Sequence, residues 1–301
     1  MNKRVLVTGG AGFVGAALVR YALSQGAEVA VLARATTDLE RLADRRSEFH
    51  LIVGDLANVE SYRAAVRAFQ PDACFHLAWV TEPGKYLQSP LNAHFIVYTI
   101  DLLRCLFAAG CSQIVSTGTC FEYARSNAEL TEDSPLDYGT PYAASKNLTA
   151  QLCSELARRA GASFAWGRLF YMVGPIDHPK RLLPSLIAAL KHDRDFPTTD
   201  GAQRADYLHV YDVAAALWSL TGQNGIFNVC SGEAITVRDL IAAVADLMGK
   251  RHLVKLGALQ RPPDLPMLIC GNHQKITRAT GWIPEIGMLD GLRNIIAASE
   301  N

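Results

Sequence analysis

A strand, a glycine-rich turn and a helix are encoded in that order by the stretch Val5-Leu6-Val7-Thr8-Gly9-Gly10-Ala11-Gly12-Phe13-Val14-Gly15-Ala16-Ala17-Leu18-Val19. The first N–H groups of a helix have no partner inside the helix, and the helix dipole favours negative charge, so a diphosphate sits well there. Glycines in this G-x-x-G-x-x-G spacing let a ligand approach closely, although they could also serve only to relieve the backbone. We predict that the turn binds a dinucleotide through Gly9, Gly12, Phe13, Val14 and Gly15.

The composition indicates a globular protein without a strong overall charge. The chain has 301 residues, of which 50% are hydrophobic, and its 29 basic and 29 acidic residues cancel. No global field favours nucleic acid or an anionic membrane, and we expect neither as a partner. The seven cysteines include no C-x-x-C pair, which favours reduced core residues over a metal site or a disulfide framework.

The amino terminus and the apolar segments favour a cytoplasmic location. The apolar run that begins at Val5 is too short for a signal peptide and continues into the glycine turn. We find no segment that approaches the roughly 20 apolar residues needed to span a bilayer. The chain is therefore expected to be a cytoplasmic protein.

Apolar runs of strand length alternate with helical stretches through the first half of the chain, which is typical of a parallel sheet covered on both faces. We predict an α/β fold of the Rossmann-like, doubly wound type, with helices at 58–69, capped by Asn58, and at 91–109. Ligands in such folds bind beyond the carboxyl ends of the strands. The predicted strands are Val5–Val7, Glu28–Leu32, Phe49–Val53, Ala73–Leu77, Ile114–Ser116 and Phe164–Leu169.

The regular alternation weakens after Val173-Gly174-Pro175, where proline and charged loops become frequent. We therefore expect a dinucleotide-binding domain at 1–173 and a smaller C-terminal α/β substrate lobe at 174–301, with the possibility that the chain crosses back between them. The elements expected in the second part are helices at 182–190, 213–220, 237–248 and 289–298 and a strand at 207–210.

The end of the second strand bears on the choice of cofactor. An acidic residue at this place accepts a hydrogen bond from the ribose 2′-hydroxyl of NAD, whereas a 2′-phosphate needs a cation. The sequence Val31-Leu32-Ala33-Arg34 contains no acid, and the planar fork of donors on Arg34 suits a phosphate. We predict NADP(H), with NAD as a possible alternative, because Arg34 could also only solvate the strand end. Asp55 is placed to contact the adenine or to cap a helix.

A phenol and an ammonium stand four residues apart in Tyr142-Ala143-Ala144-Ser145-Lys146, on a helix whose first turn contains Pro141. The charge of Lys146 is expected to lower the pKa of Tyr142 from about 10 toward neutrality, which suits a phenol to acid–base chemistry on a carbonyl or alcohol. Thr119 places a hydroxyl at the carboxyl end of the nearby strand, with Thr117 as the alternative. We predict that Thr119, Tyr142 and Lys146 form the catalytic set.

Taken together, these motifs resemble the extended short-chain dehydrogenase/reductase superfamily, in particular the NAD-dependent epimerase/dehydratase family, which acts on nucleotide sugars. The resemblance covers nearly the whole chain. Its marks are the glycine turn, Gly54-Asp55-Leu56, His76-Leu77-Ala78, Thr119, Pro141-Tyr142 with Ser145-Lys146, Arg168-Leu169-Phe170 with Gly174-Pro175, and Asp206-Tyr207-Leu208-His209-Val210 with Asp212-Val213.

The resemblance implies roles for particular residues. Tyr142 corresponds to the acid/base, Lys146 to its partner that also holds the nicotinamide ribose, and Thr119 to the hydroxyl that binds the reacting oxygen. Arg261 resembles the arginine that binds the pyrophosphate of the substrate, and Arg204 is a second candidate. Further residues implied to bind cofactor or substrate are Leu56, Leu77 and Ala78 for the cofactor and Tyr171, which replaces the family's asparagine, for the substrate.

The resemblance also sets out the candidate reactions. Dehydratases of the family have acids just after the catalytic threonine, whereas this chain has Cys120-Phe121, so dehydration is not expected. Because Arg34 favours NADPH, our first expectation is an NADPH-dependent reductase of a 4-keto-6-deoxy nucleotide sugar. The alternatives are a nucleotide-sugar C4 epimerase with tightly bound NAD(P), a reductase of a small non-nucleotide ketone, and a cofactor-binding protein without turnover.

Two further features of the sequence have a structural interpretation. The helix at 91–109 carries an apolar stripe that is either core or half of a dimer interface, and the resemblance favours a homodimer. The histidines His76, His94 and His209 lack ligand spacing with other metal-binding residues, so we expect core or hinge roles and no metal.

Overall fold

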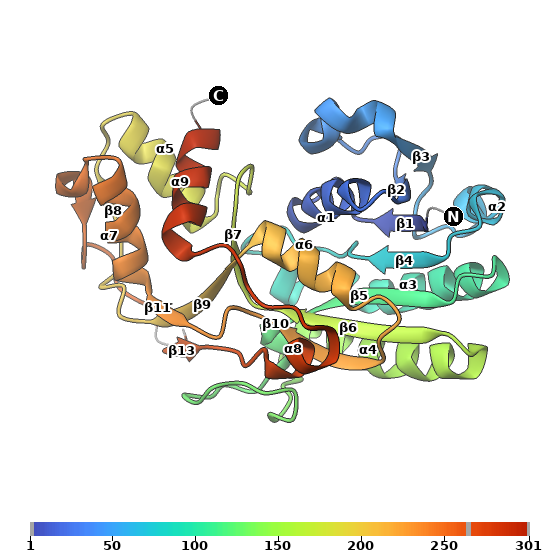
Figure 1. Ribbon diagram of the computed structural model, residues 1–301. Helices are drawn as coiled ribbons and strands as arrows, with labels where there is room; N and C mark the ends of the chain where they lie inside the picture. The colour runs from blue at the N-terminus through green and yellow to red at the C-terminus, as the bar shows by residue number, and fades with distance from the viewer. Residues whose placement is uncertain (1–2, 263–265, 300–301) are drawn as a thin grey trace.

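A seven-stranded parallel sheet forms the centre of the larger lobe in the computed structural model, which describes residues 3–262 and 266–299 (Figure 1). The strand order is β10-β6-β5-β4-β1-β2-β3, the doubly wound arrangement expected from the sequence. The six strands predicted in the first half are confirmed. The bounds of the seven strands are β1 Arg4–Thr8, β2 Glu28–Ala33, β3 Phe49–Val53, β4 Ala73–His76, β5 Gln113–Thr119, β6 Ser163–Leu169 and β10 Gly225–Val229.

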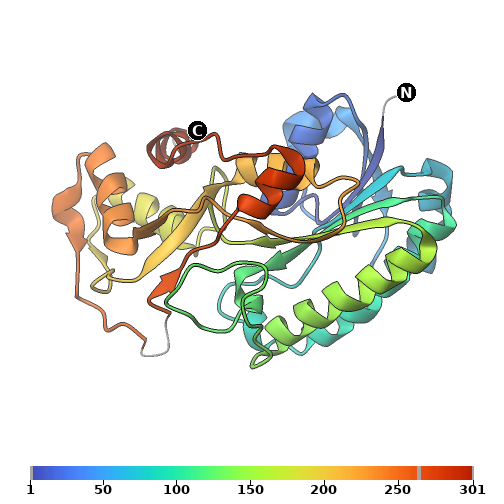
Figure 2. The same cartoon turned by 60° about the horizontal axis from the view of Figure 1, so that its bottom comes forward.

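Helices cover both faces of this sheet, so its strands are apolar on both sides. One core lies between the sheet and α1 (Phe13–Ser24), α6 (Val210–Ser219) and α8 (Gln274–Thr280). The other core lies under α2 (Glu60–Phe69), α3 (Leu91–Ala108) and α4 (Pro141–Ala160), and Figure 2 shows the two long helices α3 and α4 side by side below the sheet. The burial of both faces explains why the strand sequences read as nearly continuous apolar runs.

Local signals set the ends of α4, the helix that carries the predicted Tyr142 and Lys146. Thr140 caps its start by accepting a hydrogen bond from the N–H of Ala143 at 3.1 Å, and Pro141 occupies the first turn. Gly161 ends it in the left-handed conformation at φ 68°.

The predicted cap of α2 is wrong. Val59 occupies the N-cap position, and no side chain caps this helix. Asn58 lies one residue earlier, where its carbonyl accepts hydrogen bonds from the N–H and the hydroxyl of Ser61. Asn58 therefore closes the turn before the helix through its backbone.

The smaller lobe is built around β9 (Arg204–His209), the middle of a four-stranded sheet. Its helices α5 (Leu182–Lys191), α7 (Val237–Leu247) and α9 (Met288–Ala298) share a third apolar core. The remaining elements are β7 Tyr171–Val173, β8 Phe196–Pro197, β11 Ala234–Thr236, β12 Val254–Lys255, β13 Leu268–Ile269 and the 3-10 helices η1 Glu40–Glu48, η2 Tyr86–Gln88, η3 Cys120–Glu122 and η4 Arg251–Leu253.

The chain crosses between the lobes more than once. Strand β7 precedes residue 174 but pairs with β9 of the smaller sheet. Strand β10 follows residue 174 but pairs with β6 at the edge of the large sheet, and α6 and α8 accompany it. A single boundary at residue 173 therefore does not separate the two sheets.

Among the residues that the structure describes, one helix is long and apolar enough to match a membrane span. Helix α3 has 18 residues with a mean hydropathy of 1.3, so our expectation that no segment comes near this length is wrong. The helix packs against α4 and α2, and its residues Leu102, Leu103 and Leu106 are buried in the core under the sheet. The share of this helix that is buried is 33%.

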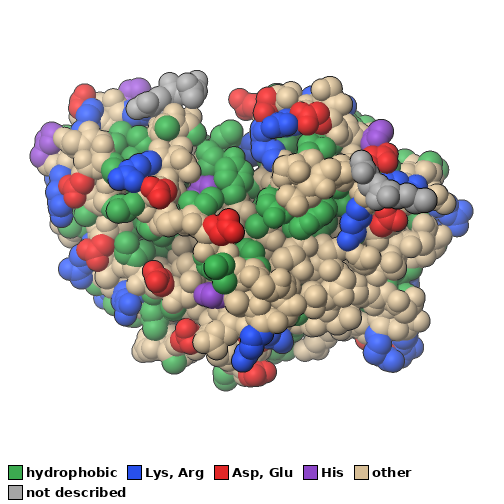
Figure 3. Space-filling view, in the orientation of Figure 1, with side chains coloured by type: hydrophobic (Ala, Val, Ile, Leu, Met, Phe, Trp, Pro, Cys, Tyr) green, Lys and Arg blue, Asp and Glu red, His purple; other side chains and the backbone are tan. Residues whose placement is uncertain are grey.

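A crevice separates the two lobes at the carboxyl edge of the large sheet. In Figure 1 the arrowheads of β1 and β4 point toward the smaller lobe on the left. Figure 3 shows that the surface is hollowed between the lobes, with hydrophobic side chains in the hollow. Because ligands of doubly wound folds bind at this edge, the crevice is where a ligand is expected to bind.

Candidate active site

The glycine turn between β1 and α1 has the shape that a diphosphate needs. Gly9 has φ +72°, and a Cβ on it would lie 2.7 Å from the backbone nitrogen of Ala78. A Cβ on Gly15 would overlap the carbonyl oxygen of Gly9. Gly12 takes the N-cap position of α1 without any side-chain cap, which leaves N–H groups of the first turn, including those of Phe13 and Val14, to a ligand. The turn therefore fits a dinucleotide.

The three predicted catalytic residues lie together at the carboxyl end of β5. Thr119 ends the strand, and its side chain shares a hydrogen bond with the phenol of Tyr142 on α4. One turn further along α4, the Nζ atom of Lys146 donates to the carbonyl of Thr117 at 2.8 Å. The same ammonium lies 3.8 Å from the ring centroid of Trp79. The backbone of Thr117 thus positions the lysine, while Thr119 is the hydroxyl that meets the phenol.

Burial governs the protonation of this set. Burial raises the pKa of Tyr142 above its ordinary value, and neighbouring Tyr86 and Glu122 raise it further against the opposing hydrogen bond from Thr119. Burial lowers the pKa of Lys146 to about 7, although the charge of Glu122 opposes this. We expected Lys146 to bring the pKa of Tyr142 toward neutrality. In the structure the ammonium is turned to a carbonyl, 6.0 Å from the centroid of the Tyr142 ring, and desolvation dominates.

The residues predicted for the adenosine side lie at the ends of β2 and β3. The Arg34 side chain is exposed and has no hydrogen-bond or ion-pair partner within 3–262 and 266–299. Asp55 is exposed and accepts from the N–H of Ala57 at 3.0 Å, so it stabilises its own turn. Leu56 packs on the core beside it. An arginine that the sequence did not single out, Arg41, donates to the carbonyl of Ala11 in the glycine turn at 3.3 Å.

The arginines predicted to bind substrate lie in the smaller lobe. Arg204 begins β9, is exposed, and donates to the carbonyl of Ala234 at 3.1 Å. Arg261 lies in the segment before β13, where its Nη1 atom is 3.9 Å from the carboxylate of Asp200 and 2.9 Å from the sulfur of Met267. These contacts use only some of the N–H donors of each guanidinium group, so both arginines have donors left for an anion.

Aromatic rings form the wall of the crevice near Thr119. Tyr171 lies with its ring centroid 5.5 Å from that of Tyr207 and 6.2 Å from that of Phe121. The rings of Tyr86 and Tyr142 meet edge to face, with their centroids 4.9 Å apart. The sequence predicted Tyr171 but missed Tyr86, because the loop at 79–89 has no periodic pattern that would place it.

The residues that follow Thr119 do not offer an acid or base to the crevice. Burial raises the pKa of Cys120 to about 12, so it stays a neutral thiol. Phe121 is an aromatic side chain packed against Tyr171. Glu122 is fully buried, and its carboxylate is 2.6 Å from the guanidinium of Arg168.

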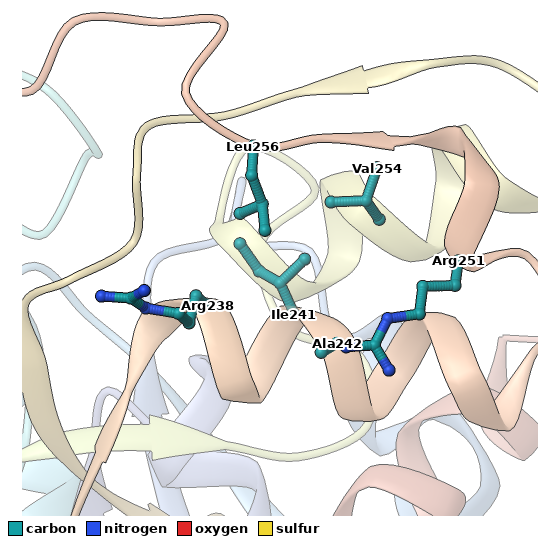
Figure 4. A pocket seen from close by; sticks show the side chains of 6 residues that line it. All are labelled: Arg238, Ile241, Ala242, Arg251, Val254 and Leu256. Carbon is teal, nitrogen blue, oxygen red and sulfur yellow. The ribbon is translucent and has the colours of Figure 1, made fainter.

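A separate pocket lies in the smaller lobe, away from these groups (Figure 4). It opens between α7 and β12, and none of its lining residues belongs to the predicted site. Arg251 at its rim already pairs with Asp246 at 2.8 Å. Within the described ranges, no group of three or more His, Cys, Asp or Glu side chains could hold a metal ion. The pocket is lined by Arg238, Ile241, Ala242, Arg251, Val254 and Leu256.

The doubly wound sheet, the glycine turn and the Thr-Tyr-Lys set define an oxidoreductase of the extended short-chain dehydrogenase/reductase type. Residues 5–230 match the NAD dependent epimerase/dehydratase family, and the chain belongs to this family. The fold and the family expected from the sequence are therefore confirmed.

The chain is also similar to individual proteins of known name. The chain is 28% identical to a UDP-glucose 4-epimerase of Azospirillum brasilense over 97% of this chain and 90% of that protein. It is 29% identical to a probable dTDP-glucose 4,6-dehydratase of Sinorhizobium fredii over 71% of this chain and 67% of that protein. A dTDP-glucose 4,6-dehydratase of Streptomyces venezuelae, solved with NAD bound, is 26% identical and superposes with a TM-score of 0.87 over 99% of this chain and 97% of that one.

Proposed function

We propose that the protein is an NAD(P)-dependent epimerase that inverts C4 of a nucleoside-diphosphate sugar. The observation that carries the proposal is the contact between Thr119 and the phenol of Tyr142 beside Lys146, at the sheet edge where the glycine turn lies. The relatives named UDP-glucose 4-epimerase, which match nearly the whole chain, favour this reaction over the reduction that we expected first.

Each residue of the set has a chemical task in this reaction. The Thr119 hydroxyl hydrogen-bonds the sugar oxygen, and Tyr142 takes the proton from that oxygen and returns it after inversion. Lys146, whose Nζ atom lies 6.0 Å from the centroid of the Tyr142 ring, would hold the cofactor ribose. When bound, a nicotinamide would supply the acceptor and donor of the hydride for the sugar carbon, and its oxidised form would add positive charge that favours the phenolate.

The chain's own residues oppose a dehydration. Loss of water from a sugar needs an acid and a base near the neighbouring carbon. The neutral thiol of Cys120 and the ring of Phe121 supply neither. The carboxylate of Glu122, three residues after Thr119, is fully buried and paired with Arg168. Similarity to dehydratases therefore does not carry their reaction to this chain.

A nucleoside diphosphate is the substrate class that the smaller lobe supports. Arg204 and Arg261 present guanidinium groups near β9 and β13, and guanidinium binds phosphate oxygens in a bidentate manner. The solved relative of Streptomyces venezuelae was crystallised with NAD and a second ligand.

Reduction of a 4-keto sugar is the second candidate. Two observations favour it. Arg34, which has no partner in the part of the chain that the structure describes, offers a cation for a 2′-phosphate, and the raised pKa of Tyr142 keeps the phenol protonated and ready to donate. In this reaction NADPH is consumed once per turnover, whereas an epimerase consumes no cofactor.

The two reactions are separated by one set of assays. Purified protein is incubated with UDP-glucose or UDP-galactose and NAD, and the C4 epimers are resolved by chromatography, while NADPH absorbance is followed with 4-keto sugar nucleotides. We expect interconversion of epimers that is lost in Tyr142→Phe. Steady NADPH consumption without epimer exchange would show that the protein is a reductase.

We further propose that the protein is a cytoplasmic homodimer joined through α3 and α4. These adjacent helices expose large apolar side chains, which are unfavourable in water and favour burial against a second copy. The exposed fractions are 55% for Val97, 43% for Leu148 and 47% for Leu152.

A further inference from the structure

A fully buried carboxylate lies directly behind the predicted catalytic set. Glu122 has no exposed surface, and its Oε1 atom accepts a hydrogen bond from the N–H of Thr119 at 2.8 Å. Its Oε2 atom accepts from Nε of Arg168 at 2.6 Å, and the indole N–H of Trp166 lies 3.1 Å from both oxygens. The carboxylate therefore holds the residue that meets the phenol by a charge-assisted hydrogen bond.

The same network reaches the helix of the lysine. The carbonyl of Glu122 accepts from Nδ2 of Asn147 at 3.1 Å, and Asn147 follows Lys146 on α4. The Oδ1 atom of Asn147 lies 3.4 Å from the guanidinium of Arg168. The Trp166 ring, whose N–H binds the carboxylate, lies 5.4 Å from the ammonium of Lys146. The Glu122–Arg168 ion pair thus links the end of β5 to helix α4.

The backbone leaves room for this network at one position. A Cβ on Gly118 would overlap both the indole nitrogen of Trp166 and the carboxylate of Glu122. Glycine before Thr119 is therefore needed for the carboxylate to approach the strand. The sequence thus supplies the acidic Glu122, the basic Arg168 and, at Gly118, a glycine that leaves room for the carboxylate.

We propose that Glu122 is a positioning residue, which fixes Thr119 and Lys146 in their reactive places through Trp166, Arg168 and Asn147. The proposal rests on the proposed function for the identity of the reacting groups. It assigns to Glu122 no contact with substrate or cofactor.

Few charged groups face Lys146, so its ionisation reports on Glu122. Glu122 is the acid that favours its ammonium, and the nearby imidazole of His76 stays neutral because burial and Lys146 lower the pKa of His76 to about 3. Loss of the carboxylate charge removes a stabilisation of the ammonium. The pKa of Lys146, about 7 in the intact protein, should then fall further.

Two variants test the proposal. Glu122→Gln removes the charge and keeps the size, and it leaves Arg168 as a buried cation without a counter-charge. The double variant Glu122→Gln with Arg168→Gln avoids that unpaired cation, so it tests the proposal even where the single variant does not fold. We expect kcat to fall about 100-fold with KM near the wild-type value, because the reacting groups shift while the outer binding groups stay.

A readout without turnover separates this proposal from the proposed function. Lysines labelled with ¹³C at the ε-methylene are titrated by NMR, and the signal with a midpoint near neutrality is assigned by its loss in Lys146→Met. We expect a lower midpoint in both Glu122 variants. Glu155→Gln is the matched control, because Glu155 pairs with Arg158 on the exposed side of the same helix and should leave kcat and the midpoint unchanged.

The outcomes are distinct. A lower lysine midpoint together with a reduced kcat supports the positioning role. A folded variant with the wild-type midpoint and the wild-type kcat overturns it and makes the ion pair purely structural. If the wild-type protein turns over no nucleotide sugar, the proposed function fails, and the lysine titration still decides whether Glu122 acts on Lys146.

Discussion

The hydroxyl of Thr8 lies 2.7 Å from Nδ1 of His76, which ties together the ends of the adjacent strands β1 and β4 just before the glycine turn. The Thr99 hydroxyl donates to the carbonyl of Phe95 at 2.7 Å, so it accepts from Nε2 of His76 at 2.9 Å. Nδ1 is therefore the acceptor, and Thr8 is its donor. His76, for which we expected a core role, thus supports the glycine turn by holding the ends of β1 and β4 together.

Replacing His76 should weaken both the fold and its response to acid. His76→Leu removes the acceptor of the buried Thr8 hydroxyl, so we expect a loss of about 1–3 kcal/mol in the free energy of unfolding at pH 7. Chemical denaturation monitored by tryptophan fluorescence measures it. The control is His50→Leu, which changes an exposed histidine of β3 and should leave stability nearly unchanged.

The pH dependence of stability follows from the same histidine. The unfolded chain protonates His76 near pH 6.5, whereas burial holds the pKa in the native state at about 3. Between these values acid favours the unfolded chain, so this group lowers the free energy of unfolding by up to about 1.4 kcal/mol per pH unit. The slope should be smaller in His76→Leu, and equal slopes in the two proteins would contradict the neutral buried state.

Tyr142→Phe should abolish turnover and leave cofactor binding intact. The substitution removes only the phenol oxygen, so we expect kcat to fall by about 10²–10⁴. Affinity for NAD(P)H, measured by fluorescence, should stay within error of the wild type. A variant with full rate would show that another group is the acid.

Glycines with the same backbone conformation should respond differently to alanine. Gly9 and Gly26 have φ values of +72° and +73°, but only at Gly9 would a Cβ meet other atoms. Gly26→Ala should cost about 1 kcal/mol of stability from backbone strain alone. Gly9→Ala should cost more and abolish the thermal stabilisation by NAD, which a melting curve with and without cofactor shows.

Arg34→Ala should change the choice of cofactor. Loss of charge-assisted hydrogen bonds worth about 1.5–3 kcal/mol weakens NADP(H) binding by about 10- to 100-fold and leaves NAD binding unchanged. Calorimetric titration with both cofactors measures the ratio. Equal losses for both would remove the argument that Arg34 binds a 2′-phosphate.

A charge on the exposed face of α3 should separate the proposed dimer. Val97→Glu places a carboxylate in the apolar patch, so sedimentation should shift from dimer to monomer. Leu289→Glu on α9 is the control, because Leu289 is similarly exposed, at 53%, but lies in the smaller lobe. A wild-type protein that sediments as a monomer would refute the dimer itself.

The larger lobe could be predicted because its signals are local. Strands with both faces buried read as apolar runs, and Pro141 and Gly161 bound the helix of Tyr142 and Lys146. Thr119 could be placed because the carboxyl ends of parallel strands meet at one edge. These features need only the chain order and the period of the pattern.

The rest depends on partners that are distant in the chain. The pairing of Glu122 with Arg168 joins residues that are 46 positions apart in the chain, one in η3 and the other in β6. A charge inside the otherwise apolar strand β6 was the available signal. The protonation of Tyr142 was predicted in the wrong direction, because the spacing to Lys146 says nothing about desolvation. The position of β10 was missed, since it follows a region of irregular composition.

The place of β10 limits how such enzymes can exchange their substrate-recognition halves. Since this late segment forms the outer strand of the early sheet, cutting the gene near codon 174 would leave the edge of β6 unpaired and prone to aggregation. Grafting a new sugar specificity onto this scaffold would have to spare α6, β10 and α8. Exchange of the whole segment after residue 174 would therefore disrupt the large sheet. New substrate specificities have to arise in the loops between the points where the chain passes from one lobe to the other.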